Sequence, residues 1–600
     1  MGSNKSVLQD KGYTLVSEQE NKTLVKNKGG DQFVIKKLNA DQDVVSNFLQ
    51  KLNYPHIVEH KETIKDGDSL YLVMELCEGG DLTHIINLKK KGTVAFSEQT
   101  TGTQGDQTKG VNTVNQQWAE QILDWTVKIC MALKHLHDQQ ILHENLQPKS
   151  IFFTACGTIR LGEFGKIRGW STDAQTTKTE ALSYVAPEIL SGRHYDGKSE
   201  IWSLGCIIYE MCMLKCAFPG KNTVEIISKI LTCSYKALPR TFSEDLRQLV
   251  TDTLQIDPAD RPSVSEILMR PFIIKHLYEK STQTIKELNV RKNYEDIQET
   301  PNVSEDSQET PKEAKVSLKV LEELADGLGT VYYNTTVGSL TGGVVGLAGG
   351  ITSIVGLILT PFTLGASLIV TGVGIGVAVA GGVTAGVSNV TKMVNQRSNR
   401  QKVKLIIAEL QEKITSTICC IQIIQIAEET EQTRLAESRI SLSNAQSDEN
   451  VFANAGARLG RGLGGISELI RLTEVASIGK VAAQTTRAVR VAGDVTVVLS
   501  ALFVAADIFF IALDSKEIHK LRSDYASIET QQESTTRSND SESGHSDAQN
   551  QQSKLQSEIM RFVIKIRETV EELNKIMNEL NDELERQERL PNNAIPNNDN

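Results

Sequence analysis

Residues 70–82 read LYLVMELCEGGDL, and this stretch predicts the architecture of the first half of the chain. An apolar run of strand length ends at Glu75, a short connector with two glycines follows, and Asp81-Leu82 begins a helix. Upstream, Phe33-Val34-Ile35-Lys36 is a second apolar strand, and it ends in a lysine. The sequence therefore predicts a small strand-rich lobe before the connector and a helical lobe after it.

Short motifs continue this order downstream. They are ILDW (122–125), ALKHLH (132–137), ILH (141–143), APE (186–188), IWSLGC (201–206) and DRPS (260–263). Together with the strand lysine and the connector they resemble protein kinases, and in their wording the NIMA-related serine/threonine kinases. The resemblance covers residues 13–279 and implies a bilobal α+β fold. It also implies nucleotide contacts at Lys36, Glu75 and Cys77.

The positions that carry phosphoryl transfer differ from the kinase pattern. No glycine lies between residues 13 and 25, where a glycine-rich loop would cover the phosphates. Residues 143–150 read HENLQPKS, so the resemblance places Asn145 at the proton-accepting aspartate, Gln147 at the lysine and Ser150 at the metal-binding asparagine. Glu163 stands at the metal-binding aspartate, one methylene longer than the residue it replaces.

These replacements remove electrostatic and positioning groups on which phosphoryl transfer depends. We therefore expect a pseudokinase: no intact catalytic residue, no metal, no cofactor, and a docking or regulatory role instead of an enzymatic one. One alternative is an ATP-dependent serine/threonine kinase, tethered to a membrane, that works through Lys36 and Glu163. Binding of ATP and magnesium without catalysis is compatible with a pseudokinase.

Residues that hold the kinase scaffold are retained. The resemblance implies that His143 and Phe164 pack together and that Glu188 and Arg261 form a buried ion pair. Glu200 stands where the family has an aspartate. Residues 96–118, rich in Thr, Gln, Gly and Asn, are expected to form a flexible surface loop.

The second half of the chain contains a long uncharged stretch. Residues 327–391 hold no Asp, Glu, Lys, Arg or His, and Thr360-Pro361 separates two apolar halves within them, Thr336–Leu359 and Leu364–Val387. Each half is long enough for a helix to cross a bilayer, which takes ~20 residues. Glycines recur at every fourth residue, which lets helices approach closely in lipid: Gly338, Gly342, Gly346, Gly350, Gly372 and Gly376. We expect a membrane-inserting hairpin over residues 336–388; the alternative is a hairpin buried in a soluble helical bundle.

A further apolar helix is expected over residues 495–513, with Asp507 inside it. An acid there is costly in lipid unless it is neutralised or paired. The hairpin, the 405–424 helix and the Asp507 helix together resemble the apolipoprotein L family over residues 317–528. That family implies lipid and membrane binding, pore-like behaviour and lipid transport; a lipid carrier that never spans the bilayer is the corresponding alternative.

Composition bounds the remaining expectations. A net charge of -11 argues against nucleic acid as the main partner, and nine cysteines without regular spacing suggest a reducing compartment. Gly2 in MGSNKS fits an N-myristoylation pattern. We expect an intracellular protein, cytoplasmic and associated with anionic membrane lipids, with a lipoprotein-associated extracellular form as the family-level alternative. The protein partner of the kinase-like domain stays unidentified.

Apolar residues at heptad spacing between 555 and 584 predict a C-terminal coiled coil that self-associates or pairs with another helix; the alternative is packing within the chain. The fold class is thus multidomain, an α+β kinase-like fold followed by an all-α membrane-active region. The expected segments are an N-terminal segment (1–12), the kinase-like domain (13–279), an acidic linker (280–316), the apolipoprotein L-like domain (317–528), a disordered segment (529–553), the coiled coil (554–590) and a tail (591–600).

Overall fold

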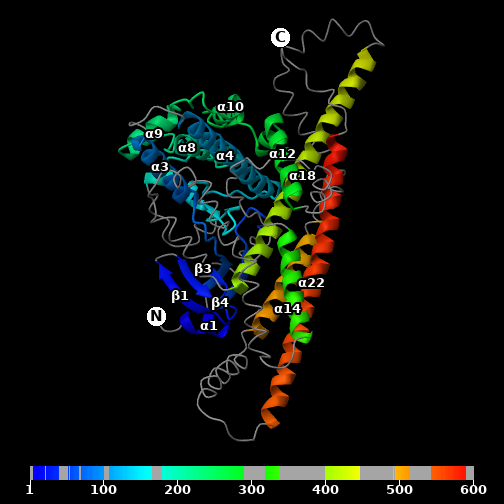
Figure 1. The fold of residues 1–600 in the computed structure, drawn as a ribbon. Coiled ribbons are helices and arrows are strands. Elements are labelled where there is room, and N and C mark those ends of the chain that lie inside the picture. The colour runs from blue at the N-terminus through cyan, green and yellow to red at the C-terminus, as the bar shows by residue number, and fades with distance from the viewer. Residues whose placement is uncertain are drawn as a thin grey trace. The chain divides into compact units, whose positions relative to one another are not determined.

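The computed structural model of the chain forms two compact units, with the boundary after Ile273. The structure describes residues 4–19, 22–38, 52–66 without 53, 69–99, 107–164, 179–288, 318–337, 399–445, 491–513 without 492, and 542–588. Figure 1 draws these parts as ribbons. Each unit is considered by itself below.

The first unit begins with a five-stranded antiparallel sheet in the order β1-β2-β3-β5-β4. Alternation decides its faces, because successive side chains on a strand point to opposite sides. In the β3–β5 register Ile35 lies opposite Val73, and Lys36 lies opposite Leu72. Lys36 therefore faces the side of the sheet away from Ile35. The strands are β1 (Thr14–Gln19), β2 (Lys22–Lys26), β3 (Gln32–Leu38), β4 (His60–Asp66) and β5 (Ser69–Glu75).

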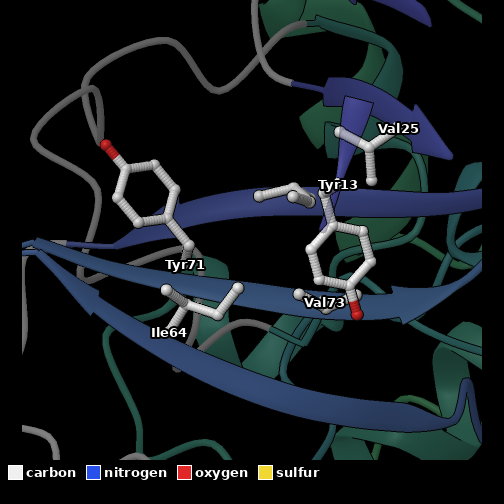
Figure 2. Packing of buried hydrophobic residues seen from close by; sticks show 6 residues of the cluster. Tyr13, Val25, Ile64, Tyr71 and Val73 are labelled. Carbon is white, nitrogen blue, oxygen red and sulfur yellow. The ribbon is translucent and has the colours of Figure 1, made fainter. Parts of the chain in front are cut away.

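The Ile35 face carries a compact hydrophobic cluster, part of which Figure 2 shows. Its members come from four strands and from the residue before β1: Tyr13, Val25, Ile35, Ile64, Tyr71 and Val73. The short helix α1 (Asn4–Asp10) packs Val7 and Leu8 against them. Burial, with the hydrogen bond that the Tyr13 hydroxyl donates to Glu62 at 2.5 Å, raises the pKa of Tyr13 to about 12. This face is therefore closed by chain that precedes the sheet.

The helical part of the first unit is built around α8 (Gly197–Met213), whose residues from 199 to 209 are all buried. A capping box starts this helix, because the Asp196 side chain accepts from the backbone amides of Lys198 and Ser199. The other elements are α3 (Leu82–Gln99), α4 (Gln107–Asp138), η2 (Pro148–Ser150), β6 (Ile151–Phe153), β7 (Ile159–Leu161), α6 (Thr179–Leu182), α7 (Pro187–Leu190), α9 (Thr223–Leu231), α10 (Glu244–Thr253), η3 (Pro258–Asp260) and α11 (Val264–Leu268).

Three sequence-based boundaries need correction. The loop expected at residues 96–118 is wrong where the chain is described, because α3 reaches Gln99 and α4 already begins at Gln107. Once the packed part of α4 is formed, extra turns avoid the cost of nucleating a new helix. The same reasoning applies at α12 (Pro271–Leu288), which extends into the expected linker, and at α22 (Glu542–Glu588), which starts before residue 554.

The second unit is helical. It contains α14 (Leu318–Val337), α18 (Asn399–Ala445), a helix over Gly493–Leu513 and α22. α14 packs along α22, Phe509 stacks on Phe562 with ring centroids 4.8 Å apart, and Gln425 of α18 donates to Glu583 of α22 at 3.0 Å. α14 is amphipathic at its start, where Leu321 and Leu324 are buried and Lys319 and Glu322 are exposed or half-buried.

The heptad positions of α22 lie inside this unit. Ile559, Phe562, Ile566, Leu573 and Met577 are all buried, so the structure packs them within the chain, which was the alternative to pairing with a second molecule. Self-association through residues 555–584 remains a prediction. The glycine-rich hairpin lies outside the described residues, except for its first two positions at the end of α14. Of the helices the structure describes, only Gly493–Leu513 is long and apolar enough to cross a membrane.

Candidate active site and membrane-facing helix

The strand lysine meets an acid that is 127 residues away in sequence. Lys36 Nζ of β3 lies 3.1 Å from Glu163 Oε2, in the segment that follows β7. Both side chains are partly shielded, with 17% and 29% of their areas exposed. Glu163 has a φ of 57°, a left-handed conformation that turns the chain sharply at this residue. The fold therefore brings together two of the predicted site residues.

His143, the first residue of the 143–150 segment, packs as the resemblance implied. His143 is fully buried, its ring lies 4.6 Å from that of Phe164, and its Nε2 is 2.9 Å from the carbonyl oxygen of Gly162. Burial lowers the pKa of His143 below its ordinary value, so the ring is neutral at pH 7. The predicted contact between His143 and Phe164 is confirmed.

Asn145, Gln147 and Ser150 form a chain of hydrogen bonds beside Glu163. The Asn145 side-chain amide donates to the carbonyl oxygen of Glu163 at 2.6 Å. Gln147 in turn donates to Asn145 Oδ1 at 2.7 Å. Ser150 is buried, and its hydroxyl donates to the carbonyl oxygen of Gln147 at 2.8 Å. The four positions singled out from the sequence thus lie next to one another, and their roles remain predictions.

A buried glutamate of α8 is hydrogen-bonded to the 143–150 segment. Glu200 of α8 accepts from the backbone amide of Glu144 at 2.8 Å and from the Tyr195 hydroxyl at 3.3 Å. His137 Nε2, at the end of α4, lies 2.6 Å from the other carboxylate oxygen. His137 lies in the 132–137 motif, but the sequence gives it no role, because nothing local links it to a residue 63 positions away.

The predicted nucleotide contacts Glu75 and Cys77 lie at the end of β5 and in the connector. The Glu75 carboxylate accepts from Arg160 Nε at 3.0 Å and from the backbone amide of Glu59 at 2.8 Å. Arg160 also donates to the carbonyl oxygen of Pro55. Arg160 therefore ties β7 to the start of the connector, and no sequence signal pointed to it. The Cys77 side chain is partly exposed and is not part of a disulfide.

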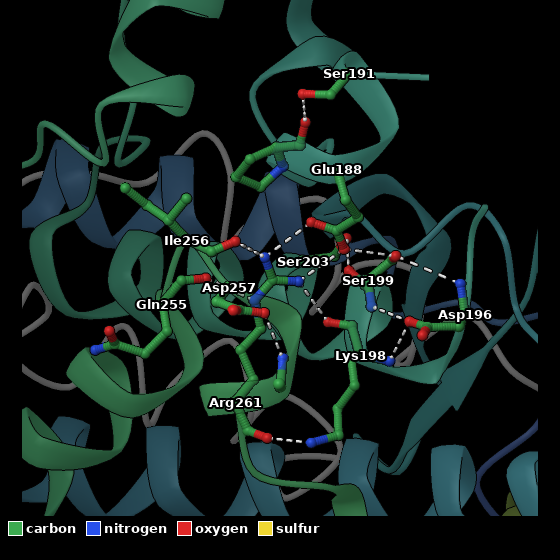
Figure 3. Close-up of polar contacts among 12 residues, drawn as sticks. Glu188, Ser191, Asp196, Lys198, Ser199, Ser203, Gln255, Ile256, Asp257 and Arg261 are labelled. Carbon is green, nitrogen blue, oxygen red and sulfur yellow. Dashed lines mark hydrogen bonds and ion pairs between the residues drawn. The ribbon is translucent and has the colours of Figure 1, made fainter. Parts of the chain in front are cut away.

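The predicted ion pair between Glu188 and Arg261 is confirmed, and Figure 3 shows its surroundings. Two parallel hydrogen bonds of 2.8 Å join the guanidinium to both carboxylate oxygens, and Ser199 donates a third to Glu188 at 2.7 Å. Burial alone would raise the pKa of Glu188, but these hydrogen bonds outweigh it and hold the pKa below its ordinary value. The guanidinium also lies 5.1 Å from the ring centroid of Trp202.

In the second unit, Asp507 forms ion pairs with two basic residues, which offsets the cost of an acid inside an apolar helix. Its Oδ1 lies 3.0 Å from Arg400 Nε and 3.1 Å from Lys404 Nζ, one turn apart on α18. Lys404 also lies 4.6 Å from the centroid of the Phe503 ring. The same helix exposes large aliphatic side chains, with Val497 69%, Val504 57%, Ile508 51% and Ile511 58% exposed.

Other predicted membrane residues cannot be placed. Gly338, Gly342, Gly346, Gly350, Gly372 and Gly376 lie outside the described residues, and so does Gly2. They remain predictions from the sequence.

Two family models match the chain. Residues 21–273 match the protein kinase domain, and residues 284–527 match apolipoprotein L. The chain is 37% identical over 259 residues to serine/threonine-protein kinase Nek1 of Mus musculus, which covers 41% of this chain and 20% of that protein. It is 36% identical to Nek5 of Homo sapiens over 38% of this chain and 29% of that protein, and 34% identical to Nek4 of Mus musculus over 42% and 31%.

These relatives contradict the expectation that the chain is not an enzyme. They are named serine/threonine-protein kinases, and the similarity runs across the kinase domain. The expectation gave too much weight to single side chains. Phosphoryl transfer passes through a loose transition state in most analyses, so catalysis is mainly positioning and electrostatic stabilisation. Lys36 and Glu163 keep one charge of each sign at the site.

The chain spans between a fifth and a third of the length of these three relatives, so their similarity concerns the kinase domain alone. The second half is covered by the apolipoprotein L match and contains the one described helix that could cross a membrane. The chain therefore joins a protein kinase domain related to the NIMA-related kinases to an apolipoprotein L domain.

Proposed function

We propose that this protein is a membrane-associated serine/threonine protein kinase whose catalytic site is a divergent form of the NIMA-related one. The observation that supports it most is the Lys36–Glu163 pair, 3.1 Å apart, within an otherwise retained kinase scaffold. Lys36 supplies a positive charge for nucleotide phosphates. Glu163 supplies the kind of oxygen ligand that magnesium takes together with phosphate oxygens.

The chain's own residues would do the following work. Bound ATP and magnesium supply the phosphoryl group and neutralise its charge. Lys36 would hold the phosphates, and Glu163 would be a ligand of the metal. Asn145, fixed by its hydrogen bonds to Glu163 and Gln147, orients a substrate hydroxyl without acting as a base. Because a neutral amide takes up no proton, the hydroxyl proton would pass to the transferred phosphoryl group or to water, and we expect slower turnover than a carboxylate would give.

The test is phosphate transfer by the full chain. Purified protein is incubated with γ-labelled ATP, Mg²⁺ and casein, and label is counted on both proteins. Lys36→Met should lower incorporation about a hundredfold, as loss of one electrostatic stabiliser does. Lys37→Met is the matched control, because Lys37 lies 5.7 Å from the Tyr71 ring centroid on the opposite face of the same strand. Label on wild type no higher than on Lys36→Met would refute the kinase proposal.

Membrane association is the second part of the proposal. The 493–513 helix is 21 residues long, and its exposed aliphatic side chains have no described partner while Asp507 is neutralised by two cations. Apolar side chains gain free energy on entering lipid, so we expect this face to meet a bilayer, together with the sequence-predicted hairpin at residues 336–388. A kinase that uses ATP would work on the cytoplasmic side. Anionic lipids are the expected partners.

Flotation with liposomes of phosphatidylserine and phosphatidylcholine tests this part. Wild-type protein should float, and Ile508→Glu should reduce the floating fraction because it places a charge on the apolar face. Ile564→Glu is the matched control, since Ile564 of α22 is also half exposed but lies on another helix. Equal flotation of wild type and Ile508→Glu would show that this helix face is not the lipid contact. Absence of wild-type flotation would remove the membrane proposal and leave the kinase assay unaffected.

A further inference from the structure

Kinase sites use two positions to hold divalent cations. One is the acid of the segment after β7, and the other is the asparagine that closes the catalytic loop. In this chain those positions are Glu163 and Ser150. The two side chains differ in exposure and in hydrogen bonding.

The Ser150 hydroxyl is committed to its own turn. Its Oγ donates to the carbonyl oxygen of Gln147 at 2.8 Å and accepts from the backbone amide of Gln147 at 3.1 Å, which closes η2 as a capping box. The residue is 0% exposed. A hydroxyl has one proton to donate and two lone pairs, so both its proton and one lone pair are in use here. A serine is also shorter than the asparagine it replaces, and its oxygen stays within the turn.

Neighbouring side chains do not replace the missing ligand. Asn145 Oδ1 accepts from Gln147, and the Asn145 amide donates to the carbonyl oxygen of Glu163. The side-chain amides of Asn145 and Gln147 are therefore bonded to each other, and that of Asn145 also to the backbone. Among the residues that the structure describes, no group of three or more His, Cys, Asp or Glu side chains could hold a metal ion.

Glu163 is different in both charge and access. Its carboxylate is ionisable, 29% exposed, and directed at Lys36 across the site. Magnesium is usually bound through one or two carboxylates together with substrate phosphates and waters, so a single glutamate is enough for one ion that the phosphates share. It is not enough for a second ion without another protein ligand.

We propose that this site takes nucleotide with one divalent cation, held by Glu163, in place of the two that kinase sites hold. This inference rests on the proposed nucleotide-dependent function. Lys36, which pairs with Glu163, takes the phosphate charge that the second ion would otherwise neutralise.

Equilibrium dialysis of the full chain measures this directly. One chamber holds protein, and both hold Mn²⁺ and a non-hydrolysable ATP analogue at equal free concentrations. The manganese that the protein chamber holds in excess of the other chamber is divided by the nucleotide that it holds in excess. We expect a ratio of about one, the value for a single carboxylate site. A ratio of about two, the usual kinase value, would overturn the inference, and so would a ratio near zero. Nucleotide retention is read separately, so a failure of the proposed function is distinct from a wrong metal count.

Three variants sharpen the result. Ser150→Ala should keep the ratio at about one, because the hydroxyl is not a ligand, whereas Ser150→Asn should raise it toward two. Glu163→Gln should lower the manganese ratio at least about tenfold while nucleotide is still retained through Lys36. Tryptophan fluorescence reports whether each variant is folded. If Ser150→Asn fails to fold, Ser150→Ala still decides the question, since loss of manganese in that variant would mean that Ser150 binds the metal.

Discussion

Replacing Arg261 by methionine should destabilise the kinase domain more than any single surface change. The Arg261 side chain is 0% and the Glu188 side chain 4% exposed, and the two share a pair of 2.8 Å hydrogen bonds. Removing the guanidinium leaves a buried carboxylate whose charge has lost its cation. Breaking a buried pair in this way costs about 3–5 kcal/mol.

The backbone adds to this cost. Arg261 also donates to the carbonyl oxygens of Gln255 at 2.7 Å, Lys198 at 2.9 Å and Ile256 at 3.1 Å. Each acceptor that stays dry after the substitution costs on the order of 1 kcal/mol more. With one of these three acceptors left dry, we expect a loss of about 4–6 kcal/mol, a large share of the ~5–15 kcal/mol that stabilises a typical domain. In urea, with a slope of about 2 kcal/mol/M, the midpoint should fall by roughly 2–3 M.

Tryptophan fluorescence isolates this domain within the full chain, because all four tryptophans, Trp118, Trp125, Trp170 and Trp202, precede residue 273. Urea titrations of wild type, Arg261→Met, Glu188→Leu and the double variant form a cycle. The double variant should be clearly more stable than the sum of the single losses predicts, because it leaves no lone buried charge. The depressed pKa of Glu188 sets the pH dependence: its contribution is present at neutral pH and is lost as pH falls through the folded-state pKa. Additive losses, or single losses below about 1 kcal/mol, would refute this account of the pair.

Three further predictions follow from the described contacts. Glu163→Gln should make nucleotide binding less dependent on magnesium, because it removes the negative charge beside Lys36. For a fluorescent ADP analogue, the Kd without Mg²⁺ divided by the Kd with Mg²⁺ should fall at least about tenfold, and an unchanged ratio would contradict the prediction. Burial, with the charges of Lys128 and Arg160, lowers the pKa of His56 to about 3, so below about pH 6.5 the unfolded chain takes up a proton that the folded chain does not, and the free energy of unfolding should drop by up to about 1.4 kcal/mol per pH unit. His56→Asn should flatten that slope in urea titrations between pH 7 and 5, and an equal slope would argue against it. Asp507→Asn removes the carboxylate that faces Arg400 and Lys404 and should speed amide hydrogen exchange in the 493–513 helix. Asp494→Asn, at an exposed site on the same helix, should not, and equal exchange in the two variants would show that the ion pair does not stabilise the helix.

The sequence carried a large part of the fold of the first unit. Apolar strands such as 70–75 and the spaced motifs of the helical lobe predicted two lobes, because strand and helix periodicities are local properties of the chain. The pairing of Glu188 with Arg261 was also predictable, through the resemblance that placed both residues in kinase motifs. Helix ends were less predictable, as α4 and α22 show, because packing can extend a helix through residues of low intrinsic preference.

The weight of each catalytic replacement could not be read from the sequence. Asn145, Gln147, Ser150 and Glu163 were found from the motif, but their identities alone suggested a chain without enzymatic activity, and the serine/threonine kinase relatives contradict that conclusion. The tertiary structure shows which of them face one another: Ser150 closes its own turn, and Glu163 faces Lys36.

What the sequence determined by itself was the order of the domains, the strand and helix pattern of the kinase part, and the need of Asp507 for a partner, since these depend on spacing and on the cost of burying a charge. Only the tertiary structure decided which partners are met. Lys36 and Glu163 are 127 residues apart, Arg400 and Asp507 are 107 apart, and His137 meets Glu200 across 63. The apolar stripe of α22 fits a second molecule and the same chain equally well by spacing, and the fold placed it against α14. Contacts between distant segments depend on how whole elements pack, and local sequence does not encode that geometry.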